Sequence, residues 1–415
     1  MRILTVILIL KILFVSQQAL AEEQITILAA GDIEWSRVVK EPEYYHGKKD
    51  RFLKRVWKAI VKNFSSSETE DWDVPYLATT ETKKYIEKQY DRKLDLPYEH
   101  HIKALKYDLE FKTEEDRDRY PFQKIAPLIR QADIAFANLE TPLADNSRYS
   151  GDFRTPTSFA QALKWAGIDV VSTANNHALD AEGTGLIETK KALSFNGIGS
   201  VGTGRNLMEA RQPFIVEKKG IKIAFFGYTQ AVKAPKFSGF ALADRSGAMP
   251  LDPFLIKEDI QNVRSQVDFI VLSFHWGMAS ENKQYISTGM RQFAHEIIDA
   301  GADIILGHHP HVPRGVELYK DKVIVYSLGN FIFGHNHDYW MDNFLARITL
   351  TKKNIGEVQL LPISGRGKDL AQPYVLKGEA AIRLLNDVKK RSEEIATRID
   401  IEEGIGIVSK EINTN

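Results

Sequence analysis

The stretch VVSTANNHALDA, residues 170–181, places two asparagines and a histidine directly after a short apolar run that begins with two valines. An apolar run of this kind, bounded by polar residues, predicts a buried strand that ends shortly before Asn175. In α/β sheets, the side chains that carry chemistry collect on the loops beyond the carboxyl ends of strands. We therefore expect Asn175, Asn176 and His177 to lie at such an edge.

The same pattern occurs four more times along the chain. In each case an apolar run with strand character ends in polar residues: ITILAA before Gly31-Asp32, IAFA before Asn138-Leu139-Glu140, FIVLSF before His275 and IILG before His308. The intervening segments have helical spacing, as in residues 158–165 and 189–195. These features predict a layered α/β fold in which five strand ends converge on one crevice.

Length and composition limit the classes of protein that remain. The chain has 415 residues, 43% of them hydrophobic, which is enough to bury a large core. Lysine plus arginine equals aspartate plus glutamate at 55 each, so no global charge attracts nucleic acid, and we expect no nucleic-acid partner. There is no cysteine, so the fold depends on neither disulfides nor thiolate metal ligands.

The first residues are typical of an export signal. Arg2 precedes an apolar stretch over residues 3–15, and the triplet Ala19-Leu20-Ala21 suits a cleavage site. We expect a signal peptide over residues 1–21, and an exported protein of the periplasm or cell envelope. The alternative is an uncleaved anchor, although the stretch contains Lys11 and falls short of the roughly 20 apolar residues that span a bilayer.

Residues 22–415 are predicted to form one domain that contains a charged helical insertion at about 37–120. Within the insertion, residues from Lys48 to Phe64 combine an apolar stripe at helical spacing with many lysines and arginines. Such a helix would contact a membrane surface or a polyanion. Alternatively, it packs its stripe on the main domain and leaves its lysines in solvent. Near the end, Ile382 to Ile399 indicates a final helix, and Gly404 marks a turn into a short terminal strand.

The polar residues at the strand ends are suited to binding divalent metal ions. The candidate donors are carboxylates, amides and imidazoles: Asp32, Glu34, Asn138, Glu140, Asn176, His177, His275, His308, His309 and His311. Oxygen and nitrogen ligands of this kind suit Mn, Zn or Fe. Two such ions sharing a carboxylate would activate water for displacement at phosphorus. In an extended segment, His309 and His311 would point to the same side and converge on one centre.

Each residue also has a simpler explanation. Asp32 could cap a helix or a turn, Glu140 could end a strand at the surface, and His275 could be a buried histidine bonded to a backbone carbonyl. A further group, residues 335–338, could supply a second set of ligands, but we interpret it as part of a surface loop and leave it out of the site. The argument for a metal centre is that five separate strand ends each deliver a ligand-type side chain.

The chain resembles the poly-gamma-glutamate capsule synthesis proteins of the CapA type, within the calcineurin-like metallophosphoesterase superfamily. The resemblance rests on motifs in the following order: Gly31-Asp32, Asn138-Leu139-Glu140, Ala174 to Asp180, His275-Trp276-Gly277, Gly307 to Val312 and Tyr326 to Phe331. It implies a metallophosphoesterase-like fold, a layered β-sandwich flanked by helices. It covers nearly all of the chain after the signal segment, except the insertion.

The resemblance also implies a role for each matching residue. Two divalent ions would be bound by Asp32, Glu140, Asn176, His275, His309 and His311, with Glu140 bridging them. His177 would be the catalytic acid near the leaving oxygen. The supporting or uncertain positions are Glu34, Asn138, Asn175, Asp180, His308 and Asn330. Two departures stand out, because Glu34 replaces the usual histidine and the bridging ligand is glutamate instead of aspartate.

The implied function is metal-dependent hydrolysis or transfer in poly-gamma-glutamate capsule synthesis. The expected partners are this polymer or a related envelope polymer, and the membrane proteins of a capsule synthase. The polymer is linked by amides whereas the fold implies phosphate esters, so the substrate is left open. The alternatives are a noncatalytic polymer-binding or scaffold subunit of the synthase complex and a general envelope phosphoesterase.

Overall fold

The computed structural model describes residues 23–36, 109, 111–146, 153–232, 239–277, 285–334 and 340–410. Three predictions lie outside these residues: the signal peptide, the basic helix between Lys48 and Phe64, and the group at 335–338. In the described part of the chain, no helix combines the length and apolar character needed to cross a membrane.

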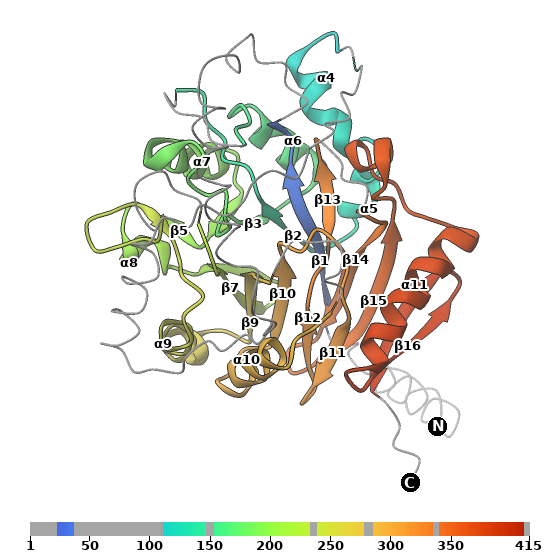
Figure 1. The fold of residues 1–415 in the computed structure, drawn as a ribbon. Helices are drawn as coiled ribbons and strands as arrows, with labels where there is room; N and C mark the ends of the chain where they lie inside the picture. The colour runs from blue at the N-terminus through green and yellow to red at the C-terminus, as the bar shows by residue number, and fades with distance from the viewer. Residues whose placement is uncertain are drawn as a thin grey trace, which may run out of the picture.

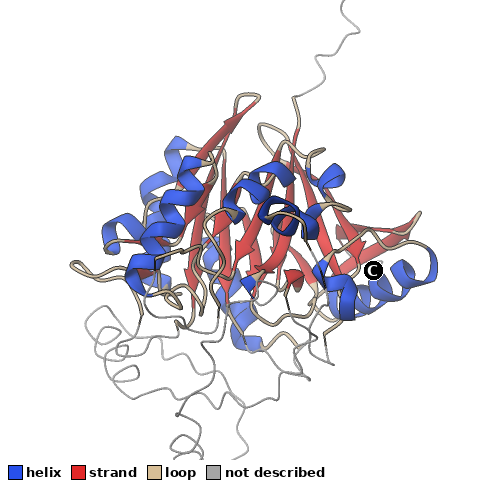
Figure 2. Cartoon of the chain, turned by 90° about the horizontal axis from the view of Figure 1, so that it is seen from above, coloured by secondary structure: helices blue, strands red, loops and turns tan. Residues whose placement is uncertain are grey.

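Two sheets form the centre of the molecule (Figures 1 and 2). The first sheet has the order β16 (Thr397–Glu402), β17 (Ile405–Lys410), β15 (Ile355–Ile363), β14 (Asn343–Leu350), β1 (Ile25–Glu34), β2 (Ile134–Leu139), β3 (Val170–Ser172) and β4 (Gly199–Val201), with β13 (Asn330–Phe333) also paired to β1. The second has the order β11 (Val316–Tyr319), β12 (Lys322–Val325), β10 (Ile304–His308), β9 (Phe269–His275), β7 (Ile221–Thr229) and β6 (Phe214–Lys218). A two-stranded sheet pairs β5 (Thr203–Gly204) with β8 (Gly247–Ala248).

Helices flank this sandwich, as Figure 2 shows, and one of them, α11 (Gly378–Glu393), packs on the hydrophobic cluster between the two sheets. The other described helices are α4 (Glu114–Arg119), α5 (Ala126–Ile129), α6 (Phe159–Ala166), α7 (Glu182–Phe195), α8 (Leu207–Ala210), α9 (Pro253–Val263) and α10 (Thr288–Asp299). Single-turn 3₁₀ helices occupy Tyr120–Phe122, Arg264–Gln266 and Gly367–Ala371. The layered α/β sandwich flanked by helices that the sequence predicts is confirmed.

Three hydrophobic clusters account for these layers. The first lies between the two sheets and joins residues such as Phe136 and Phe225, whose rings stack 5.7 Å apart. The second packs α5 and α6 on the first sheet, and the third packs α9 and α10 on the second. Strands β1, β2 and β9 are buried on both faces, which explains why they appear in the sequence as continuous apolar runs.

The parallel strands place their carboxyl ends at the same pole of the sandwich. In the first sheet β1, β2, β3 and β4 run parallel, and in the second β7, β9, β10 and β12 do so. At this pole β1 passes very close to the turn before β13. A Cβ on Gly31 would lie 1.9 Å from the carbonyl oxygen of Gly329, so only glycine fits there.

The predicted insertion is described only in its last part. Within it, α4 begins after Thr113, whose hydroxyl accepts a hydrogen bond from the Asp116 amide at 3.0 Å. Asp118 of α4 then accepts a hydrogen bond of 2.6 Å from the hydroxyl of Ser158, just before α6. Helix α4 thus packs against α6.

Candidate metal centre

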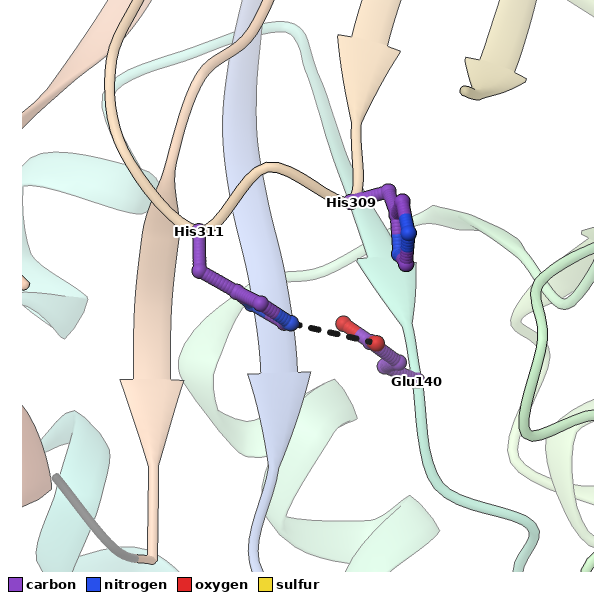
Figure 3. Close-up of side chains that lie close together, drawn as sticks. All are labelled: Glu140, His309 and His311. Carbon is purple, nitrogen blue, oxygen red and sulfur yellow. Dashed lines mark ion pairs between the residues drawn. The ribbon is translucent and has the colours of Figure 1, made fainter. Parts of the chain in front are cut away.

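The polar residues predicted from five strand ends come together at the carboxyl pole. Asp32 lies in β1, Glu140 follows β2, Asn176 and His177 follow β3, and His275 ends β9. His309 and His311 lie on the loop after β10, on either side of Glu140 in the close-up of Figure 3. The site therefore spans the junction of the two sheets.

Glu140 is at the centre of this arrangement. Its side chain is fully buried, and three imidazoles present their Nε2 atoms to its Oε1 atom. The distances are 3.7 Å from His311, 3.8 Å from His275 and 4.0 Å from His177. These separations exceed the roughly 2.7–3.2 Å of a hydrogen bond. Metal–ligand bonds of about 2.0–2.2 Å would put two donors on one ion roughly 3–4 Å apart, which matches them.

Two groups of side chains could each hold a metal ion. One consists of Glu140, His309 and His311, and the other of Asp32, Glu140 and His275. Within each group the donor atoms lie within 4.8 Å of one another. Glu140 belongs to both groups. Carboxylate and imidazole donors of this kind suit a divalent transition metal, so the residues present fit such an ion.

Asp32 is fixed from both sides of its carboxylate. Its Oδ1 atom accepts a hydrogen bond of 2.8 Å from Asn138 Nδ2, and its Oδ2 atom accepts one of 3.2 Å from the backbone N–H of His309. Burial raises the pKa of this carboxyl, but contacts with His308, His311 and Asn138 outweigh it and leave the pKa of Asp32 lowered. The carboxylate is therefore held in its ionised form, as a metal ligand must be.

His275 and Asn176 face each other across the second group. The Asn176 Oδ1 atom lies 3.0 Å from His275 Nε2, and only 2% of His275 is exposed. Burial is the main cause that lowers the pKa of His275 well below its usual value, and the nearby histidines lower it further. A neutral imidazole binds metal through the nitrogen that carries no proton. Because an amide oxygen only accepts, the Nε2 proton that faces Asn176 Oδ1 must move to Nδ1 when Nε2 binds an ion.

His177 lies at the edge of the cluster with its own carboxylate partner. Its Nδ1 atom is 2.7 Å from Asp180 Oδ2, which also accepts a hydrogen bond of 2.8 Å from the backbone N–H of Phe153. The Phe153 ring stacks on the imidazole with 3.9 Å between centroids. The Nε2 atom of His177 is thus directed toward Glu140, while Asn175 Oδ1 accepts a hydrogen bond of 3.1 Å from the His177 amide.

The loop that carries His309 and His311 differs from the extended segment expected from the sequence. Both residues have left-handed backbones, with φ of 93° and 59°. The expectation of an extended segment, in which alternate residues share a side, is therefore wrong for this loop. Its bends still bring both histidines into one donor group with Glu140 (Figure 3).

Several predicted residues lie close to the centre without belonging to either donor group. Glu34 accepts hydrogen bonds from the Ser36 hydroxyl and amide, and one of 3.1 Å from the Gly334 amide. His308 places its Nδ1 atom 3.2 Å from Asp32 Oδ1. Asn175 donates a hydrogen bond of 2.8 Å to the carbonyl of Leu139.

Asn330 is hydrogen-bonded to His311, and Asp180 is hydrogen-bonded to His177. Sequence reasoning missed the aromatic residues that pack around these two histidines: Phe153, Phe333 and Trp340. Phe153 is separated by 24 positions from the histidine on which it stacks, and no local spacing signals the contact.

Comparison with known proteins gives the family of this chain. The model of the bacterial capsule synthesis protein family PGA_cap matches residues 26–335. The PGA biosynthesis protein CapA of Bacillus subtilis is 32% identical over 249 residues, which cover 58% of this chain and 64% of the relative. The capsule biosynthesis protein CapA of Bacillus anthracis is 29% identical over 256 residues, covering 59% of this chain and 61% of the relative.

This chain therefore spans less than two thirds of the length of these two relatives. Among solved structures, a 5'-nucleotidase precursor from Thermus thermophilus matches with a TM-score of 0.37 and 11% identity, over 65% of this chain and 52% of that one. The family match extends over all five strand ends that supply the cluster. The chain belongs to the bacterial capsule synthesis protein family PGA_cap.

Proposed function

We propose that this chain is an exported, metal-dependent enzyme of poly-gamma-glutamate capsule synthesis that hydrolyses or transfers a group at the carboxyl pole of its sandwich. The observation that carries the proposal is the position of Glu140, a buried carboxylate common to both donor groups. The family and the Bacillus relatives supply the connection to capsule synthesis.

In this proposal two divalent ions, of Mn, Zn or Fe, occupy the centre. Asp32, Glu140 and His275 would hold one ion, with Asn176 as an additional oxygen donor, and His309 and His311 would hold the other together with Glu140. When bound, such ions lower the pKa of water and stabilise negative charge that develops on oxygen. The donor distances around Glu140 and the lowered pKa of Asp32 support this assignment.

The chain's own catalytic group would be His177. Asp180 accepts the Nδ1 proton at 2.7 Å, which fixes the ring and stabilises its protonated form. Its Nε2 atom then faces the cluster and can deliver a proton to a leaving oxygen or nitrogen. Phe153 limits rotation of the ring by stacking on it. Because both a phosphate ester and an amide need such a proton, the arrangement suits a phosphorylated carrier or the polymer itself.

Metal analysis combined with a substrate screen tests the proposal. The purified protein, freed of metal and reloaded with Mn²⁺ or Zn²⁺, would be assayed on a generic phosphodiester and on poly-gamma-glutamate. Asn176→Ala and His309→Ala should each bind less metal. His177→Ala should keep its metal and lose about 10²–10⁴-fold in turnover.

The outcomes separate this proposal from a noncatalytic role. Metal binding without turnover of either substrate, unaffected by His177→Ala, would favour a scaffold subunit that holds polymer for membrane partners. Turnover of the phosphodiester but not of poly-gamma-glutamate would favour a general envelope phosphoesterase, especially if the cells that produce the protein lack the capsule polymer. Full metal content in all three variants would overturn the assignment of the ligands.

A further inference from the structure

We propose that Asn330 is a positioning residue that directs the Nε2 lone pair of His311 toward Glu140; this rests on the metal-binding function proposed above. Asn330 is the first residue of β13 and is aligned with Asp32 of β1 in the parallel pairing. Its side chain is fully buried, and its Oδ1 atom lies 2.8 Å from His311 Nδ1.

The direction of this hydrogen bond determines which nitrogen of His311 can bind metal. An amide oxygen only accepts, so the Nδ1 atom of His311 must carry the proton. In the neutral imidazole, Nε2 then keeps its lone pair. That atom lies 3.7 Å from Glu140 Oε1, the carboxylate oxygen that three imidazoles of the centre face.

Two aromatic rings limit the freedom of the same imidazole. Phe333, at the end of β13, lies edge-on with 5.1 Å between ring centroids, and Trp340 lies 5.2 Å away. Phe333 and Trp340 also pack on each other at 5.0 Å. A ring packed in this way is hindered from rotating to present its other nitrogen, so the orientation set by Asn330 is maintained.

Asn330 also keeps the proton of His311 away from Asp32. The Nδ1 atom is 3.6 Å from Asp32 Oδ2, compared with 2.8 Å from Asn330 Oδ1. Without the amide, Asp32 would be an alternative acceptor for this proton, and its carboxylate would be drawn from its own donor group. Loss of Asn330 should therefore weaken metal binding by both groups.

The test compares variants that differ only in the acceptor. Asn330→Ala removes it and should weaken Mn²⁺ or Zn²⁺ binding, measured by competition with a chelator, by about 10–100-fold. Asn330→Asp retains an acceptor oxygen but adds a negative charge beside Asp32, and it should lose less affinity than Asn330→Ala. Asn206→Ala is the matched control, because it deletes an amide acceptor that caps α8, far from the centre in the chain.

A second measurement does not require metal. Nitrogen NMR of the metal-free protein, with labelled histidines and His311→Gln for assignment, should show His311 protonated at Nδ1 in the wild type and in Asn330→Asp. Asn330→Ala should show a mixture of tautomers. If Asn330→Ala fails to fold, Asn330→Leu provides a larger side chain that also lacks an acceptor.

The two measurements distinguish a failure of this inference from a failure of the metal-binding proposal. A wild type that binds no metal would refute the proposed function, while the tautomer of His311 would still test Asn330. Unchanged tautomer and affinity in Asn330→Ala would overturn the positioning role.

Discussion

The two poles of the sandwich both carry carboxylates at the ends of strands, but in opposite surroundings. At the amino pole, the residue directly before each of β2, β3, β9 and β10 is an aspartate that accepts the backbone N–H of a residue in the neighbouring strand. The pairs are Asp133 with Thr26, Asp169 with Ala135, Asp268 with Lys222, and Asp303 with Ile270, at 2.8–3.0 Å. These contacts have the length of ordinary hydrogen bonds.

At the carboxyl pole, the distances around Glu140 are longer and its neighbours are imidazoles. Glu140 faces three Nε2 atoms at 3.7–4.0 Å. A carboxylate with fixed donors at hydrogen-bonding distance stabilises the fold, whereas one that faces several imidazole nitrogens at longer distances suits a cation. The comparison assigns structural stability to the amino pole and metal binding to the carboxyl pole. Substitutions at each pole test this assignment.

The largest effect is expected from Glu140→Gln at the carboxyl pole. This substitution removes the charge shared by both donor groups while nearly preserving the shape of the side chain. The affinity for Mn²⁺ or Zn²⁺ should fall by at least about 100-fold. This exceeds the usual effect of losing a residue that only orients a metal ligand. Thermal unfolding of the metal-free protein should not shift downward, since a buried anion is removed.

Glu34→Gln is the matched control for this prediction. Glu34 is equally buried, but its carboxylate accepts hydrogen bonds from Ser36 and the Gly334 amide. The single amide oxygen of glutamine can accept either from Ser36 or from the Gly334 amide, so the variant should lose some stability, but its metal content should remain at the wild-type level. Equal loss of metal in both variants would contradict the distinction between a bridging carboxylate and a structural one.

The converse prediction concerns Asp303 at the amino pole. Its carboxylate is held by the Ile270 amide at 2.8 Å, by Arg264 at 2.6 Å and by Lys322 at 2.5 Å. Asp303→Asn keeps one acceptor but leaves the two cations without their counter-charge. We expect the free energy of unfolding, from urea denaturation, to fall by about 2–3 kcal/mol, with unchanged metal affinity. A loss of metal binding in the folded variant would refute the division between the poles.

The sequence predicts the carboxyl pole well because each ligand directly follows an apolar run. Burial on both faces makes β1, β2, β9 and β10 visible as continuous runs, and parallel strands must bring their carboxyl ends together. The aspartates of the amino pole directly precede the same runs. Their role was not predicted, because an aspartate before a strand also suits an ordinary turn.

Other features could not be predicted because they depend on contacts between distant segments. Nothing in the residue types of His309 and His311 predicts their left-handed backbones. The hydrogen bond that Glu34 accepts from the Gly334 amide, 300 positions away, has no sequence signal either. The predicted final helix continues to Ile399, whereas α11 ends at Glu393 and Ile399 lies in β16. Ile395 and Ile399 are both buried, as they would also be on the inner face of a longer helix. Apolar spacing alone could therefore not place the end of the helix.

The smallest effect is expected at the exposed edge of the amino pole, from Asp133→Asn. The pKa of Asp133 is lowered, because hydrogen bonds from Lys219 and Thr26 and the charge of Lys219 outweigh the effect of burial. A lowered carboxyl pKa contributes stability that is present above the unfolded-state value of about 4 and is lost as the pH falls through the folded-state value. Lys219 is half exposed, so the substitution should cost at most about 1 kcal/mol at neutral pH.

Urea denaturation between neutral pH and about pH 3 measures this contribution. The curves of wild type and Asp133→Asn should approach each other as the pH falls below 4, because protonation removes from the wild type the charge that the variant lacks. High salt should reduce the difference at neutral pH, as for any exposed ion pair. A difference that persisted in acid would mean that the charge of Asp133 is not the source of its stabilising effect.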